Sequence, residues 1–338
     1  MGGDVIPYDP YHPHLGYTVL VAALACLSIF LYSRYALKQH PRLRVFLYAL
    51  AISLPVLGEV MSYFITEWRP APNTLPGYML THFHAQVLNR YPIDSFLSPT
   101  TMDLLLVALI GSAIISAARF LLGTHRLNHA LAIAVPLAKT PHQRVGERLQ
   151  ELDHTQYGAL PPIFVVDLPI YLAFATGLFH SRIYISTTLL HELSVDEAVA
   201  VLCHEWAHIR RRDIQWNWVI RMFRDMLWFL PTSYLAWSAM MLSQDEACDV
   251  LAARMTRQPL VLARALVKVA SSRKNIAIQR LTTASLFAQA GSAPRVRVEQ
   301  MIALNNPASP KNRLPTLGAM MLGFLLLVLS VLPALLGS

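Results

Sequence analysis

Four long apolar stretches limit what this chain can fold into. They cover residues 15–37, 45–66, 102–123 and 317–336, and each is long enough to cross a lipid bilayer, which takes about 20 apolar residues. The chain of 338 residues is 54% hydrophobic and only 14% charged, which is too apolar for an ordinary water-soluble protein. The sequence therefore predicts a mainly α, four-span membrane protein whose surroundings include the lipid bilayer.

Basic residues predict the orientation of the chain in the membrane. They follow the first and third stretches and precede the fourth, whereas the amino-terminal segment has no lysine or arginine. By the positive-inside rule, residues 124–313 form a cytoplasmic domain and residues 67–100 an extracytoplasmic loop. Residues 1–123 then hold three transmembrane helices and residues 314–338 a fourth. The expected location is the inner (cytoplasmic) membrane of a cell, with several crossings.

The positive net charge has the same explanation. A charge of +8 arises mostly from this cytoplasmic bias, and it also attracts anionic lipid headgroups. Nucleic-acid binding is the alternative interpretation of a basic chain. It is disfavoured because no basic stripe with interleaved aromatic residues occurs, so no nucleic-acid partner is expected.

Residues 124–313 contain the pattern of a small α+β domain. Residues 142–153 have the spacing of an amphipathic helix, and residues 162–166, 171–176 and 182–186 are β-like runs separated by turn-forming residues. A small antiparallel sheet is the expected arrangement. An edge strand of such a sheet can pair with an extended peptide, and residues 182–186 are the favoured candidate.

Residues 214–242 allow two interpretations. The segment is long, apolar and rich in tryptophan, yet it contains Arg221, Arg224 and Asp225. It predicts either a helical hairpin broken at Pro231 that lies in the membrane interface, or a helix pair in the domain core. Tryptophan together with arginine favours the interface, and charges inside the run disfavour a full crossing.

The sequence His204-Glu205-Trp206-Ala207-His208 predicts a metal site. On a helix, residues four apart share a face, so both imidazoles can reach one ion, and neutral imidazole suits Zn²⁺. Glu205 is then placed to act as general base toward water acidified by the metal. Ser194 and Glu197 form a capping box at the start of this helix, and its apolar side predicts that the histidines are buried.

A zinc ion held by two histidines needs a further protein ligand, which leaves a position for water. Asp245, Glu246 and Asp249 begin the next helical pattern. Either Asp245 or Glu246 is the candidate third ligand, and Asp249, one turn on, is a candidate hydrogen-bond partner of a ligating histidine. Cys203 and Cys248 are interpreted as small buried side chains.

These motifs together resemble a known family. Residues 182–186 (RIYIS), 204–213 (HEWAHIRRRD) and 247–249 (ACD) look like BlaR/MecR-type membrane metallopeptidases and are similar to the related HtpX/Ste24-type family. The resemblance covers roughly residues 140–275. It implies a four-span protein with a cytoplasmic zincin-like metallopeptidase domain and one Zn²⁺ per chain.

Two features depart from the resembling families. Those families place the ligand glutamate four residues before the aspartate, and here that position is Asp245, with Glu246 only three before Asp249. Either the shorter Asp245 binds the metal, or a small helix rotation brings in Glu246, which is slightly favoured for its reach. The outside segments also lack a Ser-x-x-Lys acylation motif, so β-lactam sensing by that route is not expected, and residues 67–100 or a separate sensor protein would have to supply a trigger.

The resulting hypothesis is a zinc endopeptidase that cleaves proteins at the cytoplasmic face, either a repressor or damaged membrane proteins. No substrate-binding residue is identified. The alternative of another class is a non-catalytic membrane scaffold or signalling subunit with a degenerate site. A transporter or channel rests only on the apolar stretches and on Glu59 within the second of them.

Overall fold

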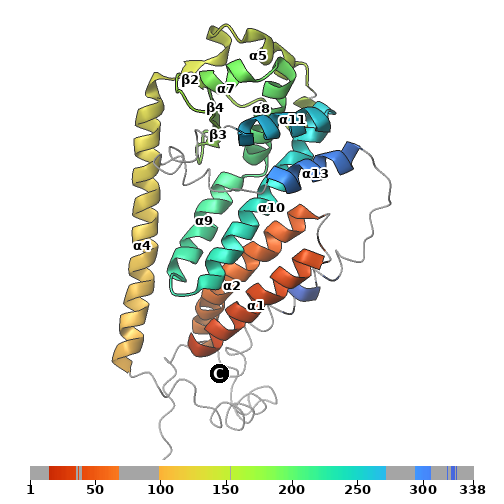
Figure 1. Ribbon diagram of the computed structural model, residues 1–338. Helices are drawn as coiled ribbons and strands as arrows, with labels where there is room; N and C mark the ends of the chain where they lie inside the picture. Colours follow the sequence, from red (N-terminus) through yellow and green to blue (C-terminus); the bar gives the residue numbers. More distant parts are fainter. Residues whose placement is uncertain are drawn as a thin grey trace, which may run out of the picture. The chain divides into compact units, whose positions relative to one another are not determined.

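The described part of the chain is mainly helical with one small sheet, as Figure 1 shows for the computed structural model. This agrees with the α+β composition predicted from the sequence. The structure describes residues 15–35, 37, 40–67, 99–152, 154–271 and 294–305, together with residues 318, 321–323 and 325.

The chain divides into two compact units. Unit 1 is Met1–Ser116, Ile220–Trp237 and Arg313–Ser338, and unit 2 is Ala117–Val219 and Ser238–Asn312. The division falls inside three long helices, α4 (Pro99–Ala130), α9 (Asp213–Met226) and α10 (Pro231–Thr256).

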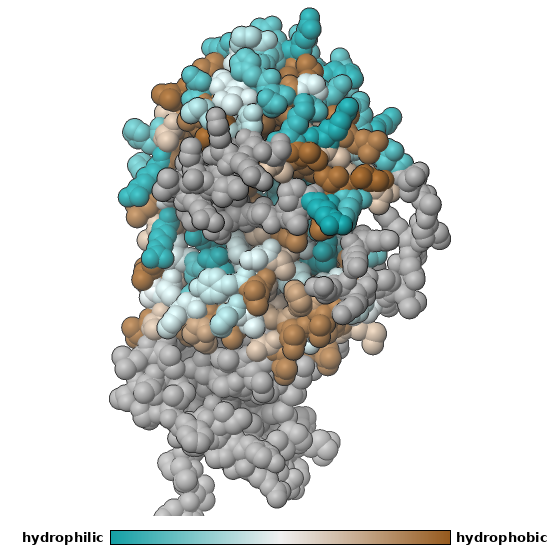
Figure 2. All heavy atoms as spheres, in the orientation of Figure 1, coloured by the Kyte–Doolittle hydropathy of each residue, from teal (hydrophilic) through white to brown (hydrophobic). Residues whose placement is uncertain are grey.

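In unit 1, helix α1 (Leu15–Tyr35) packs against α2 (Pro41–Glu67). The inner faces meet at fully buried residues such as Ile29 of α1 and Leu47 and Ile52 of α2. The outer face of α1 exposes large apolar side chains, and Figure 2 shows hydrophobic residues gathered where this helix lies. An apolar outer face suits lipid rather than water.

A membrane location is supported most directly by α4. Among the residues that the structure describes, Val107–Ile133 is the one segment long and apolar enough to cross a membrane, and only 11% of its most apolar window is buried. It overlaps the predicted span 102–123. Helices α1 and α2 cover the first two predicted stretches, while the loop 67–100 and nearly all of residues 314–338 lie outside the described residues. Four crossings therefore stay a prediction.

The helix break expected at Pro231 is confirmed. Helix α9 ends at Met226 and α10 begins at Pro231, so residues 214–242 form parts of two helices. Whether this pair enters the membrane interface stays a prediction.

The charges within this segment are paired inside unit 1. Asp225 accepts a hydrogen bond of 2.5 Å from the Ser116 hydroxyl, forms an ion pair with Arg224, and lies 3.7 Å from the Arg221 guanidinium. The Arg224 guanidinium also lies 5.0 Å from the centre of the Trp237 ring, within cation–π range. Paired charges of this kind are far less costly to bury than isolated ones.

Unit 2 is built on a sheet of order β1-β2-β4-β3. The strands are β1 (Val135–Pro136), β2 (Ile163–Val166), β3 (Ala173–Thr176) and β4 (Arg182–Ser186). Strands β1 and β2 pair antiparallel, β2 and β4 pair parallel, and β4 and β3 pair antiparallel. The sheet is therefore mixed, and the prediction of an antiparallel sheet is wrong.

The prediction that residues 182–186 form the edge strand is also wrong. Strand β4 has the expected bounds, but it lies between β2 and β3. Its residues Ile183, Tyr184 and Ile185 are all buried, on both faces of the sheet, which is the pattern of a central strand. The edge beyond β4 is β3, which has the same apolar, two-faced appearance in the sequence.

Helix α8 (Val195–Arg210) begins with the predicted capping box. The Ser194 hydroxyl accepts a 3.3 Å hydrogen bond from the Glu197 backbone N–H, and the Glu197 carboxylate accepts one of 2.9 Å from the Ser194 backbone N–H. Lys268 of α11 (Pro259–Ser271) adds an ion pair of 2.7 Å to Glu197. The helix is followed by Arg212 in the left-handed region, at φ 58°, which turns the chain into α9.

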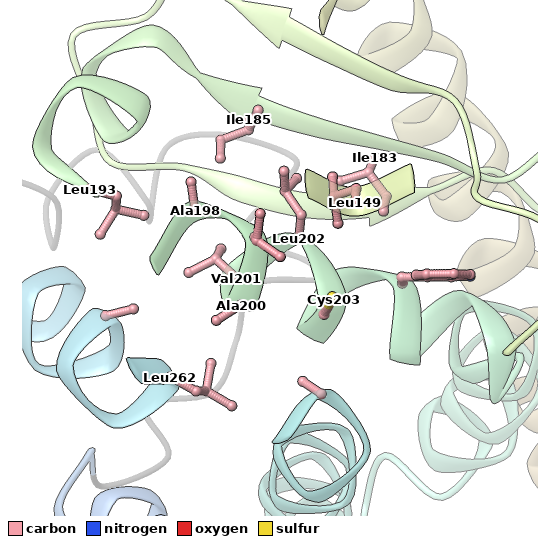
Figure 3. Close-up of a cluster of buried hydrophobic side chains, with 14 of the residues drawn as sticks. Leu149, Ile183, Ile185, Leu193, Ala198, Ala200, Val201, Leu202, Cys203 and Leu262 are labelled. Carbon is pink, nitrogen blue, oxygen red and sulfur yellow. The ribbon is translucent and has the colours of Figure 1, made fainter. Parts of the chain in front are cut away.

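The core of unit 2 surrounds α8, as Figure 3 shows. On one side of the helix Leu202 packs toward Ile183 of β4 and Leu149 of α5 (Gln143–Gln150), and on the other side Ala200 faces Leu262 of α11. Among its described residues, unit 2 also contains α6 (His154–Tyr157), α7 (Thr187–Glu192), α13 (Pro294–Asn305) and the short 3-10 helices η2 (Leu131–Ile133) and η3 (Leu137–Lys139). Burial on both sides holds α8 in a fixed position, which matters for the residues that it carries.

We expect Ser194→Ala to lower the free energy of unfolding by about 1 kcal/mol, because an orphan N–H at the start of α8 loses its acceptor. This corresponds to a fall in the midpoint of thermal unfolding of about 2–4 °C. The matched control is Asp196→Asn in the same helical turn, whose side chain is 53% exposed and leaves the capping box intact. An equal effect of both variants would contradict this account of the helix start.

Candidate metal centre

Helix α8 carries both histidines of the sequence motif on one face. The ring centres of His204 and His208 are 4.9 Å apart, and the ring planes cross at 84°. His204 is 9% exposed, and His208 and Glu205 are half-buried. The spacing predicted from the motif is thus present in a partly enclosed setting.

Helix α10 brings Asp245 to these two rings. Oδ1 of Asp245 lies 3.7 Å from Nε2 of His208, and one donor atom from each of His204, His208 and Asp245 lies within 4.8 Å of the others. Two imidazole nitrogens and a carboxylate oxygen are a donor set that suits Zn²⁺ and leaves a fourth position for water or substrate. These residues therefore fit a zinc ion.

Glu246, the other candidate ligand, is placed differently. Its side chain is buried, with 3% of the residue exposed, and its carboxylate does not belong to the group formed by the two histidines and Asp245. The structure thus brings together His204, His208 and Asp245 of the predicted set.

Each imidazole has a carboxylate at its other nitrogen. Nδ1 of His204 lies 2.8 Å from Oδ1 of Asp249, in a direction that departs from that of a regular ring hydrogen bond. Nδ1 of His208 is hydrogen-bonded at 2.9 Å to Oδ2 of Asp213. A carboxylate behind a ligating histidine fixes the tautomer and the ring orientation, which leaves Nε2 for a metal. Asp249 therefore lies where the sequence places it, next to a candidate ligand.

Asp249 is in turn held by an arginine from α13. Nε and Nη2 of Arg297 donate hydrogen bonds of 2.6 and 2.7 Å to the two carboxylate oxygens, and Asp249 is 0% exposed. Burial alone would raise the pKa of Asp249, but Arg297 and His204 outweigh it and hold the pKa well below its usual range. The buried carboxylate is therefore ionised and fully paired.

A second group of donor atoms lies on the far side of His208. The Cys248 sulfur lies 3.4 Å from Oδ2 of Asp213 and 3.4 Å from Nδ1 of His208. Asp213 also accepts hydrogen bonds of 3.1 and 3.2 Å from Nε of Arg211. Burial raises the pKa of Cys248 to about 12, so the thiol is protonated. Asp213 and Cys248 are both buried, so two of the three members of this group are enclosed by protein.

The contact between His208 and Asp213 shifts the pKa values of both groups. Burial would lower the pKa of His208, but the hydrogen bond of its Nδ1 to the Asp213 carboxylate raises it above its ordinary value. For Asp213, burial opposes ionisation, yet His208 and Arg211 lower its pKa overall. The surroundings of His208 therefore favour positive charge.

Two residues of this centre were missed by reasoning from the sequence. Asp213 follows His208 by five residues and is the first residue of α9, so an acid close in sequence to the second histidine was available as a signal. Arg297 had no such signal, because it follows Asp249 by 48 residues and reaches the centre only through the packing of α13 on α11.

The fold and the site together define a class. A helix with two histidines and a glutamate, packed on a small mixed sheet and followed by a helix with the further acid, is the arrangement of a metallopeptidase. The family model described as BlaR1 peptidase M56 matches residues 47–298, most of the chain. The protein therefore belongs to this family of membrane metallopeptidases.

Curated relatives carry the name HtpX. A protease HtpX homolog from Tropheryma whipplei is 24% identical over 224 residues, covering 56% of this chain and 77% of that protein. One from Acidiphilium cryptum is 30% identical over 167 residues, covering 38% and 58%. The protease HtpX homolog 1 of Saccharolobus solfataricus is 37% identical over 90 residues, covering 25% and 29%. The matched part of the chain thus spans from under a third to about three quarters of the length of these relatives.

We expect Asp245→Ala to weaken Zn²⁺ binding by more than about 100-fold, because it removes a metal ligand. The loss of a residue that only hydrogen-bonds to a ligand costs about 10–100-fold. The matched variant is Glu246→Gln, which keeps the size of a buried side chain and is expected to bind Zn²⁺ as the wild type does. Competition with a chromophoric chelator measures both affinities. If Glu246→Gln weakens Zn²⁺ binding more than Asp245→Ala does, Glu246 is the third ligand.

Proposed function

We propose that this protein is an integral-membrane zinc endopeptidase with one Zn²⁺ per chain. His204, His208 and Asp245 are the proposed ligands, with Glu246 as the alternative to Asp245. The observation that carries the proposal is the convergence of three donor atoms within 4.8 Å from helices α8 and α10, next to Glu205.

The residues of the chain have distinct parts in this reaction. Zn²⁺, when bound, supplies the Lewis-acid chemistry that makes water nucleophilic and polarises a peptide carbonyl. Glu205 takes a proton from the attacking water and passes it to the leaving amine. Asp249 and Asp213 hold the two imidazoles from behind, so that the rings do not turn when charge develops at the site.

Glu205→Gln tests the role of the general base. It keeps the size of the side chain and leaves all proposed ligands in place, so we expect an unchanged zinc content and a loss of peptidase activity of at least about 100-fold. Comparing the membrane proteomes of cells with the wild type and with Glu205→Gln measures the activity and identifies substrates at once.

This comparison also separates the peptidase from the scaffold hypothesis. A non-catalytic scaffold or signalling subunit would leave the two proteomes alike while both proteins carry zinc, and that result would contradict the proposed activity. The departure at Asp245 motivates the alternative, whereas the intact His204, Glu205 and His208 oppose it.

An extended segment of a protein substrate is proposed to pair with β3. This strand ends the described sheet and packs against α8. The backbone of Ser186 in β4 donates to Leu172, whereas that of Ile183 donates to Pro162 on the other side of β4. Because bonded and non-bonded pairs alternate in an antiparallel ladder, the backbone groups of Ala173 and Ala175 point away from β4. A peptide that adds to this edge would pair with these groups.

Ala175→Pro removes the outward N–H of β3 without removing a bond to β4. We expect kcat/KM toward a labelled unfolded casein to fall about five- to tenfold, as for the loss of about one hydrogen bond to the transition state. Ala175→Gly, which keeps the N–H, is the matched control. Equal activity of both variants, with equal zinc content, would exclude β3 as the docking edge.

The cellular role is proposed from the predicted topology. With residues 124–313 on the cytoplasmic side of the inner membrane, the substrates are either a cytoplasmic repressor, in regulatory proteolysis, or membrane proteins, in quality control. A separate sensor protein would supply the trigger in the first case. The HtpX relatives are named proteases, which supports a protein substrate.

A further inference from the structure

Arg297 lies at the metal centre, although it belongs to none of the sequence motifs. It is on α13, and its side chain is only 12% exposed. Its Nε and Nη2 hold both oxygens of Asp249 in a bidentate contact, at 2.6 and 2.7 Å. This fork fixes the plane of the carboxylate as well as its position.

The same guanidinium faces two carboxylates that serve the centre differently. Asp249, which it binds directly, lies 2.8 Å from Nδ1 of His204. Its Nη1 lies 3.7 Å from Oδ2 of Asp245, while Oδ1 of Asp245 faces Nε2 of His208 at 3.7 Å. One arginine therefore contacts the acid behind the first histidine and the outer oxygen of the proposed third ligand.

We propose that Arg297 is a positioning residue of the metal centre, which sets the affinity for Zn²⁺ by orienting Asp249 behind His204 and by holding the outer oxygen of Asp245. The inference rests on the proposed metal site. It makes α13 a part of the peptidase centre, because the guanidinium reaches both carboxylates only while α13 is packed in place.

The attachment of α13 to unit 2 does not depend on this ion pair alone. Met301 of α13 is 0% exposed and belongs to the same core cluster as Leu262 of α11. Burial of an apolar side chain stabilises the packed helix directly, whereas a buried ion pair contributes little net stability because both groups lose their hydration. Apolar packing therefore holds the helix, and the arginine is available to orient the carboxylates.

The experiment compares three variants of the full chain in detergent. Arg297→Met removes the guanidinium, and Arg297→Lys keeps a positive charge but not the planar fork. Arg295→Met is the matched control, because Arg295 is on the same helix, is 87% exposed and forms an ion pair with Glu299 of its own helix rather than with an acid of the centre. Zn²⁺ affinity is measured by chelator competition, coordination by the visible absorption of bound Co²⁺, and folding by thermal unfolding of the metal-free protein.

We expect Arg297→Met to weaken Zn²⁺ binding about 10–100-fold and to change the Co²⁺ spectrum, as for the loss of other partners behind metal ligands. Arg297→Lys is expected to bind more weakly than the wild type and more tightly than Arg297→Met. Arg295→Met should bind as the wild type does.

The inference is overturned if Arg297→Met binds Zn²⁺ with wild-type affinity and an unchanged Co²⁺ spectrum. If Arg297→Met does not fold, Arg297→Lys decides, and wild-type affinity in that variant overturns the inference. His208→Ala separates this from failure of the proposed function. Loss of Zn²⁺ in His208→Ala with retention in Arg297→Met refutes only the role of Arg297, whereas equal binding by His208→Ala and the wild type refutes the metal site.

Discussion

Two imidazoles one helical turn apart can hold a metal only if their rings are prevented from turning, and the centre of unit 2 depends on this constraint. Asp249 lies behind His204 at 2.8 Å, and Asp213 lies behind His208 at 2.9 Å. The two acids come from different helices, α10 and α9, and each is held by an arginine. Helices α9 and α10 therefore each place a carboxylate at an Nδ1 atom of α8, and α13 supplies the arginine that holds Asp249.

The charges of the centre are balanced in a way that suits a divalent cation. The centre holds the carboxylates of Glu205, Asp213, Asp245 and Asp249 but only the two guanidiniums of Arg211 and Arg297, so an ion of charge +2 bound by His204, His208 and Asp245 would balance the formal charges. The group that contains Cys248 has the donor types for a metal as well, but it is enclosed. Since a catalytic metal needs an open position, the group with Asp245 is the one that fits a peptidase.

The sequence predicted the local elements better than their arrangement. The capping box at Ser194, the break at Pro231 and the strand 182–186 depend on neighbouring residues, and the structure has all three. The order of the strands depends on long-range pairing, so nothing local in residues 182–186 distinguishes a central strand from an edge strand.

In the metal centre, too, the residues of a local motif could be predicted from the sequence, whereas those brought in by tertiary packing could not. His204, Glu205 and His208 follow from one helical motif, and a later acid follows from the need for a third ligand. The preference for Glu246 over Asp245 relied on side-chain length, whereas the group that the structure forms is set by the rotation of α10. Arg297 reaches the site through tertiary packing alone.

X-ray absorption at the zinc edge of the purified protein tests the central claim most directly. The account requires one zinc per chain, with nitrogen and oxygen neighbours at about 2.0–2.2 Å and no sulfur. A sulfur neighbour at about 2.3 Å would place the metal at Cys248 instead. Folded wild-type protein that takes up no zinc would contradict the account altogether.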